Sequence, residues 1–129
     1  VVQDDPHSPK LWIRYENPKM RYKERLLNLT TEWPAVLTEY VTQRRPQARI
    51  FECTARNLEY VLRDVAILSR VPRQKVSFEG LRWTCALSDH RQHMAEDEQR
   101  QKLGLSHVTW RETSHKLEKL AGLSIRKDE

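Results

Sequence analysis

The residues best suited to chemistry in this sequence are lysines and arginines gathered in three clusters. The first cluster lies between residues 10 and 25, where six basic residues stand against only two carboxylates. The clusters are Lys10, Arg14, Lys19, Arg21, Lys23 and Arg25; then Arg44, Arg45 and Arg49; and then Arg70, Arg73, Lys75 and Arg82. Guanidinium and ammonium groups bind phosphate oxygens, so these clusters suit a polyanion, most simply a nucleic-acid backbone. Solubility alone is the competing explanation.

The net positive charge of the chain lies in its first two-thirds. The net charge is +5 and the sequence pI is about 9.4. Residues 1–82 carry 15 Lys and Arg against 10 Asp and Glu, whereas residues 83–129 carry 8 of each kind. The chain has 129 residues, of which 38% are hydrophobic, so it is long enough for one domain with a hydrophobic core.

No segment of the sequence is suited to a membrane or to secretion. The longest apolar runs are a few residues, and no stretch has the charged start and long apolar segment of a signal peptide. Two cysteines are too few for a disulfide framework. We expect a cytoplasmic protein without membrane contact or cofactor. Because the sequence begins Val1-Val2 and not with Met, we also expect it to belong to a longer protein.

A β-hairpin is the first element predicted to position the basic residues. Residues 1–9 are predicted to form an irregular arm. Residues 11–15 and 24–29 are rich in apolar, aromatic and β-branched residues, which favours two strands. The turn signal Glu16-Asn17-Pro18-Lys19 begins the loop between them. The hairpin therefore carries the basic loop.

Five helices are predicted after the hairpin from capping residues and apolar periodicity. They run from Thr30-Thr31 to Pro46, from Thr54 to Pro72, from a cap at Ser77 to about Arg91, from Ala95 to Leu103, and from a cap at Ser106 to about residue 121. Residues 49–51 are predicted to form a short extended piece, and Gly104 to end the fourth helix. The fold class is α+β: a small antiparallel hairpin or sheet packed on a mainly helical bundle.

Apolar residues at helical spacing are expected to face the core. They are Trp33, Val36, Leu37, Tyr40 and Val41; Leu58, Val61, Leu62, Val65 and Leu68; Phe78, Leu81 and Cys85; and Trp110, Thr113, Leu117, Leu120 and Ala121. Most of the four tryptophans, Trp83 included, are expected in the core. His90 and His93 lack a third ligand at a clear spacing, so they are expected to be exposed side chains and not a metal site.

The element order and two short motifs resemble the C-terminal catalytic domain of tyrosine recombinases, the phage integrases. In that family a hairpin precedes helices that carry a His-x-Leu-Arg-His-Thr motif and then a Leu-Gly-His-Ser motif. The matching segments here are 79–84 and 103–106, which lie about twenty residues apart. Segments 23–29 and 50–52 match the family's basic stretch and its Leu-Phe-Pro-like segment. The resemblance covers roughly residues 10–121.

The resemblance implies metal-free phosphoryl transfer, in which a tyrosine attacks a DNA phosphodiester and arginines neutralise the developing charge. Arg82 matches the second of the family's two arginines, and Lys19 or Lys23 matches the hairpin lysine that protonates the leaving oxygen. The first arginine would lie upstream of this chain. Arg14, Lys19, Arg21, Lys23, Arg25 and Arg82 are the expected DNA-binding residues.

Three positions of this sequence depart from the family's catalytic set. Glu79 and Leu105 stand where the family has histidines, and Ser114 stands where the nucleophilic tyrosine is expected. A carboxylate beside a phosphate site is repulsive unless it is paired or protonated. No tyrosine follows Tyr60. The resemblance therefore implies a degenerate or truncated recombinase domain, and it leaves open whether the chain is an enzyme.

The expected function is binding of double-stranded DNA by an integrase-like domain related to DNA recombination and integration in phages or mobile elements. Strand cleavage by the chain itself is not expected. One alternative is the C-terminal part of a longer active recombinase. Another is a protein interaction module on the same scaffold, with self-association through the helix at 106–121. The expected organisation is an arm at 1–9, the integrase-like domain at 10–123 and a frayed tail at 124–129.

Overall fold

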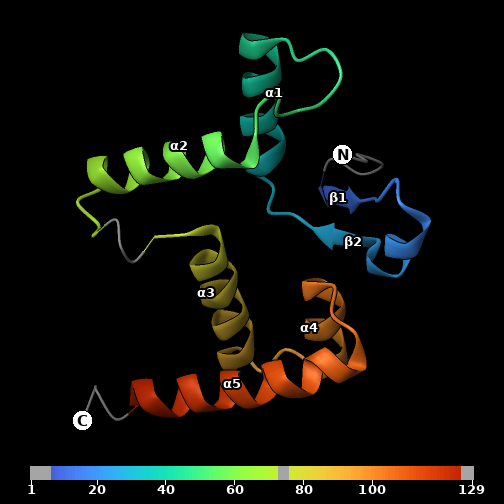
Figure 1. Cartoon of the computed structure of the whole chain (residues 1–129), viewed down its shortest axis with the longest axis vertical. Helices are drawn as coiled ribbons and strands as arrows, with labels where there is room; N and C mark the ends of the chain where they lie inside the picture. Colours follow the sequence, from blue (N-terminus) through green and yellow to red (C-terminus); the bar gives the residue numbers. More distant parts are fainter. Residues whose placement is uncertain (1–6, 73–75, 126–129) are drawn as a thin grey trace. The chain divides into compact units, whose positions relative to one another are not determined.

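The computed structural model describes residues 7–72 and 76–125. The chain divides into two compact units, Val1–Glu52 and Cys53–Glu129. The described part is mainly helical and holds one two-stranded antiparallel sheet (Figure 1), so the α+β class is confirmed at this coarse level. Most of the predicted arm and residues 126–129 of the predicted tail lie outside the described residues. No helix in the described ranges is both long and apolar enough to cross a membrane.

The first unit opens with the predicted hairpin. Strand β1 (Lys10–Ile13) pairs with β2 (Arg25–Asn28), so that Trp12 lies opposite Leu26. Both strands are slightly shorter than predicted. Pro9, the last residue of the predicted arm, is buried, and its carbonyl accepts a hydrogen bond from the amide of Leu29 at 2.9 Å. The arm is therefore tied to the hairpin at this end.

Helix α1 (Trp33–Arg44) follows, but its start and the segment after it differ from the prediction. The N-cap is Glu32, which makes no side-chain hydrogen bond to the helix. The Thr30 carbonyl closes a turn by accepting from the Trp33 amide at 3.2 Å, so the helix begins after the predicted Thr30-Thr31 start. Residues 49–51 form bends and not an extended piece. The Glu52 carboxylate accepts hydrogen bonds from the amides of residues 47 and 48, each at 2.9 Å, and this curls the segment.

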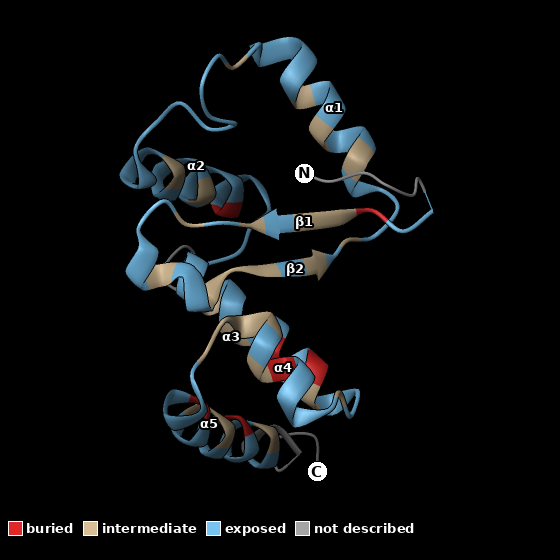
Figure 2. Ribbon diagram, turned by 90° about the vertical axis from the view of Figure 1, so that its right-hand side faces the viewer, coloured by how far each residue is buried: buried red, intermediate tan, exposed pale blue. Residues whose placement is uncertain are grey.

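The second unit begins with α2 (Ala55–Leu68), which Thr54 caps as predicted through a hydrogen bond from the Asn57 amide to its side chain. The predicted apolar face exists, but much of it is exposed (Figure 2). Val65 is 50% exposed and Leu68 84% exposed, while Ala66 is the helix's buried residue. The amphipathic pattern thus predicted the helix correctly and its burial incorrectly.

Three further helices surround the core of the second unit. They are α3 (Phe78–Arg91), α4 (Glu96–Leu103) and α5 (His107–Ile125). Ser77 and Ser106 accept hydrogen bonds from the amides of Gly80 and Thr109, so both predicted N-caps are confirmed. Gly104 ends α4 in the left-handed conformation, with φ of 67°, which glycine adopts at little cost.

The core of this unit is a cluster of Ala86, Trp110 and Leu117. The partly buried side chains packed against it are Trp83, Leu87, Leu103 and Leu105. Leu117 is completely buried and joins α5 to α3 at this point. Trp83 and Trp110 therefore pack as predicted.

Several side chains predicted to face a core are exposed. On α3, Phe78, Leu81 and Cys85 are exposed, whereas Ala86 and Asp89 are buried. This happens because α4 and α5 both pack on the side of α3 that carries Ala86 and Asp89. The other large apolar side chains that were expected in a core and are exposed are Trp12, Trp33, Val36, Val41, Val61, Val65, Leu68 and Leu120.

Candidate nucleic-acid interface

The basic loop of the hairpin is a short 3₁₀ helix, η1 (Pro18–Lys23). Asn17 caps it by accepting a hydrogen bond from the Lys19 amide at 3.0 Å, and Pro18 occupies the first helical position, where its missing N–H costs nothing. At the other end Glu24 accepts a hydrogen bond from the Tyr15 amide at 3.2 Å, which ties the base of the loop. The sequence did not predict this helix.

The loop spreads its cations around η1. A 3₁₀ helix has three residues per turn, so Lys19, Arg21 and Lys23 lie on three different sides of it. Lys19 and Arg21 are exposed, and Lys23 is half-buried with its ammonium 5.7 Å from the centre of the Tyr22 ring. Cations that point to different sides can contact several charges of an extended anionic surface, but they do not converge on one small anion.

The charges of the loop are not neutralised locally. Among the residues that the structure describes, no carboxylate forms an ion pair with Arg14, Lys19, Arg21 or Lys23. Arg14 lies over the Trp12 ring, with its guanidinium carbon 4.7 Å from the ring centre. Arg25 donates to the Lys23 carbonyl at 2.9 Å and supports the end of the loop. The four cations therefore present net positive charge to any ligand.

The second unit brings residues of segments 79–84 and 103–106 together in a surface pocket of about 230 Å³. One side of the pocket is α3, and the other side is formed by the end of α4, the turn after it and α5. The lining residues are Glu79, Arg82, Trp83, Ala86, Leu103, Leu105, Thr109 and Thr113. The four residues of α3 follow the helical spacing that places them on one face.

Arg82 is the cation of this pocket. Its Nη2 donates to the Leu103 carbonyl at 2.7 Å, and the residue is otherwise exposed. This hydrogen bond uses one of the five N–H donors of the guanidinium group, so the others can reach a ligand. No carboxylate in the described ranges pairs with Arg82. A backbone carbonyl therefore positions the Arg82 guanidinium group, and no carboxylate in the described residues neutralises its positive charge.

Glu79 brings a negative charge to the same pocket. Its Oε1 accepts a hydrogen bond from Trp83 Nε1 at 3.0 Å, one turn along α3. The carboxylate is thereby held in the same pocket as Arg82. Leu105 completes the departure from the family pattern, because an apolar side chain lines the pocket where a hydrogen-bond donor was expected.

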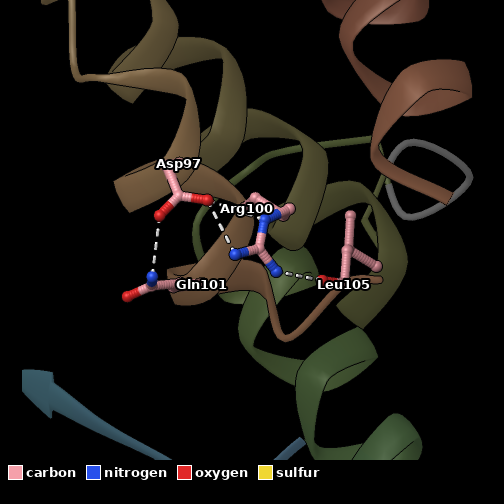
Figure 3. A network of polar contacts seen from close by, with 4 residues as sticks. All are labelled: Asp97, Arg100, Gln101 and Leu105. Carbon is pink, nitrogen blue, oxygen red and sulfur yellow. Dashed lines mark hydrogen bonds and ion pairs between the residues drawn. The ribbon is translucent and has the colours of Figure 1, made fainter. Parts of the chain in front are cut away.

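The turn that presents Leu105 is held by Arg100 (Figure 3). Arg100 donates to the Asp97 carboxylate at 2.7 and 3.0 Å and to the Leu105 carbonyl at 3.1 Å. The hydrogen bond from Arg100 holds the pKa of Asp97 below its usual value. Gln101 donates to the second oxygen of the same carboxylate at 2.9 Å. This network fixes the path of the chain from α4 into the pocket.

A second polar cluster lies on the neighbouring side of α3. Asp89 is buried and accepts from Lys102 Nζ at 2.7 Å. Burial is the largest single influence on the pKa of Lys102 and lowers it, but the hydrogen bonds and charges of Asp89 and Cys85 together outweigh burial, so the pKa is raised. Gln99 is also buried, and it donates to the Ala86 carbonyl at 2.5 Å. These bonds attach α4 to α3 and thereby support the pocket wall.

Ser114 does not line the pocket. Its hydroxyl donates to the Arg111 carbonyl at 3.0 Å, within its own helix. Thr109 and Thr113 line the pocket instead, and Thr113 donates to the Thr109 carbonyl at 3.0 Å. Sequence reasoning missed Thr109, although its position three residues after the Ser106 cap and four before Thr113 could have indicated it.

The other candidate residues are distributed between the two units. Arg14, Lys19, Arg21, Lys23 and Arg25 belong to the first unit, and Arg82 belongs to the second. From the second and third basic clusters, Arg44, Arg45 and Arg49 belong to the first unit and Arg70 to the second, while Arg73 and Lys75 lie outside the described residues. His107 and His115, both on α5, are exposed. Comparisons with protein-family models, curated proteins and solved structures found no match to this chain.

Proposed function

We propose that this chain is a DNA-binding domain with the fold of the tyrosine-recombinase catalytic domain, that it acts in the cytoplasm, and that it has no strand-cleavage activity of its own. The observation that carries the proposal is the pocket in which Glu79, Arg82, Leu103 and Leu105 meet. These residues belong to two motifs about twenty positions apart in the sequence. A phosphate-binding pocket requires this kind of convergence around an arginine.

The hairpin supplies the second support. It carries six basic residues against two carboxylates between residues 10 and 28. Among the described residues, no carboxylate forms an ion pair with the four cations Arg14, Lys19, Arg21 and Lys23. Duplex DNA carries one negative charge per ~1.7 Å of its axis, and its affinity for a protein comes largely from released counterions. A loop with cations on several sides suits contact with successive phosphates. Binding through Arg14, Lys19, Arg21, Lys23 and Arg82 follows from this.

The pocket also explains why strand cleavage is not part of the proposal. Cleavage requires a nucleophile at the phosphate, and the residues lining the pocket offer only the hydroxyls of Thr109 and Thr113. Among the lining residues, Glu79 is the one carboxylate that could accept a proton from these hydroxyls, and its Oε1 already accepts a hydrogen bond from Trp83. Arg82 can bind a phosphate in this pocket without activating it.

A salt series tests the proposal. Fluorescence anisotropy of a labelled duplex should give tight binding at low salt, and a plot of log affinity against log salt should have a slope of roughly −4 to −5 if about five phosphates are contacted. Exposure of a nicked duplex to the same protein should give no covalent adduct. Absence of binding at low salt would overturn the proposal, and a covalent adduct would replace it with the active-recombinase alternative.

Self-association through α5 is the alternative with a structural observation behind it. Val108 is 75% exposed and Leu120 is 41% exposed on this helix. Sedimentation velocity with and without duplex separates the two possibilities. Association that does not respond to DNA, together with a flat salt series, would favour the interaction module.

A further inference from the structure

The hairpin of the first unit exposes an apolar pair on one of its faces. Successive side chains of a strand alternate between faces, and here the exposed positions are Trp12 on β1 and Leu26 and Asn28 on β2. Trp12 and Leu26 lie directly opposite each other and are 47% and 52% exposed. The other face holds Leu11, Ile13 and Leu27, all half-buried. Two large apolar side chains therefore lie next to each other on the face of the hairpin that is open to solvent.

The exposed Trp12 ring has one cation over it and a second nearby in the sequence. Lys10 precedes Trp12 by two residues and Arg14 follows it by two. The guanidinium carbon of Arg14 lies over the Trp12 ring, 4.7 Å from the ring centre. Even with this guanidinium over it, almost half of the tryptophan surface is open. Tyr22 in η1 repeats the arrangement, 68% exposed with the Lys23 ammonium 5.7 Å from its ring centre. Positive charge and open aromatic rings therefore alternate along the hairpin.

This combination fits a ligand that offers both phosphates and accessible base faces. In a continuous duplex the flat faces of the bases are stacked on one another, so an aromatic side chain cannot stack on them without separating a base step. In a single-stranded segment each base has a free face, and cationic grooves with stacking aromatics are the usual way to bind it. A protein partner would have to present carboxylates to the cations as well as an apolar surface to the pair, whereas each nucleotide of a single strand carries both a phosphate and a base face.

We propose that the Trp12–Leu26 face of the hairpin binds unpaired bases, so that DNA with a single-stranded gap is preferred over continuous duplex. The inference rests on the proposed DNA-binding function and adds a preference to it. The phosphates of the ligand lie against the hairpin cations, and one unpaired base stacks on Trp12. Tyr22 offers a second stacking position.

Two probes test this inference: a continuous 20-base-pair duplex and the same duplex with a six-nucleotide single-stranded gap. The gapped probe carries fewer phosphates, so tighter binding to it would not come from charge alone. The full chain should bind the gapped probe more tightly. Trp12→Leu should weaken binding to the gapped probe by roughly five- to 100-fold, the range observed for loss of one base–aromatic stack. Its affinity for the continuous duplex should change by less than about twofold, because the cations remain.

Two further variants control for folding and for general loss of aromatic surface. Trp12→Phe keeps a flat ring and should retain most of the preference for the gapped probe. Trp33→Leu removes another exposed tryptophan of the same unit and should leave both affinities unchanged. Equal affinity of the wild type for the two probes, or equal losses on both probes in Trp12→Leu, would overturn the inference and leave the proposed function standing. Failure to bind either probe would overturn the proposed function itself.

Discussion

Trp83 donates its indole N–H to the Glu79 carboxylate at 3.0 Å, one turn away on α3, and thereby holds a negative charge in the same pocket as Arg82. Arg82 does not pair with this carboxylate but donates to the Leu103 carbonyl. The two opposite charges are thus fixed separately, Glu79 by a side chain and Arg82 by the backbone. A phosphate that approaches Arg82 gains one interaction and meets one repulsion.

Removal of the Glu79 charge should strengthen binding to duplex DNA. Glu79→Gln retains an oxygen that can accept from Trp83, so the pocket should keep its shape while the repulsion disappears. A screened surface charge of this kind is worth up to about 1 kcal/mol, which corresponds to an affinity gain of about two- to fivefold in anisotropy titrations. Glu79→His, which can also donate to a phosphate, should bind at least as tightly.

Glu112→Gln is the matched control for the Glu79 variants, because Glu112 is an exposed carboxylate of the same unit outside the pocket. Both changes alter the net charge equally. An equal gain in the two variants would mean that overall charge, and not the pocket, determines the effect.

Loss of the Arg82 charge should weaken duplex binding. Arg82→Gln removes the charge but can still donate to the Leu103 carbonyl, and Arg82→Ala removes both. If Arg82 contacts one phosphate, either variant should reduce the steepness of the salt plot by about one. Arg111→Ala, an exposed arginine on α5 outside the pocket, provides the comparison. Unchanged slopes for both Arg82 variants would show that this arginine does not touch the DNA backbone.

The ion pair between Lys102 and Asp89 should contribute to stability. Lys102→Met keeps the length of the side chain but leaves the buried Asp89 carboxylate without its cation. Because Lys102 is itself about one-third exposed, solvent offsets part of the loss. We expect the free energy of unfolding in urea to fall by about 1–3 kcal/mol. Lys116→Met on the exposed side of α5 should have little effect, and equal losses in the two variants would contradict the assignment.

Asp97 should make the second unit more sensitive to acid. Its pKa is lowered in the folded chain, chiefly by the hydrogen bond from Arg100, so its stabilising contribution is complete above the usual aspartate pKa of about 3.9. The contribution is lost as the pH falls through the lowered pKa. Urea midpoints for the wild type and Asp97→Asn should therefore differ at pH 6 and converge at the acid end. A difference that is constant with pH would rule out this origin.

Capping residues predicted the helices of this chain better than apolar periodicity predicted their burial. Thr54, Ser77, Ser106 and Gly104 act at the predicted places because a cap depends only on neighbouring backbone groups. Periodicity was wrong for α3, where apolar residues occur on more than one side and the packing of α4 and α5 selects the side with Ala86. The choice depends on contacts between segments far apart in sequence, which a single helix pattern does not contain.

The sequence also indicated some residues of the candidate site but not the contacts that hold them. Arg82, Glu79 and Leu105 were identified from motif positions, and they do line one pocket. The sequence could not show that Trp83 would bind the Glu79 carboxylate or that Arg82 would be held by a carbonyl. Nor did it predict η1, which determines how Lys19, Arg21 and Lys23 are spread. These features arise from side-chain directions and from a turn whose length left several shapes possible.

The burial of Leu117 against Ala86 also determines how the backbone of the chain exchanges its amide hydrogens with solvent. Leu117 is fully enclosed, whereas α1 has no buried residue among its twelve. Amide deuteration followed by mass spectrometry should therefore label α1 early and the middle of α3 and α5 last. A motion that opens the pocket at Arg82 without disturbing Leu117 would be visible as early labelling of the α4–α5 turn alone.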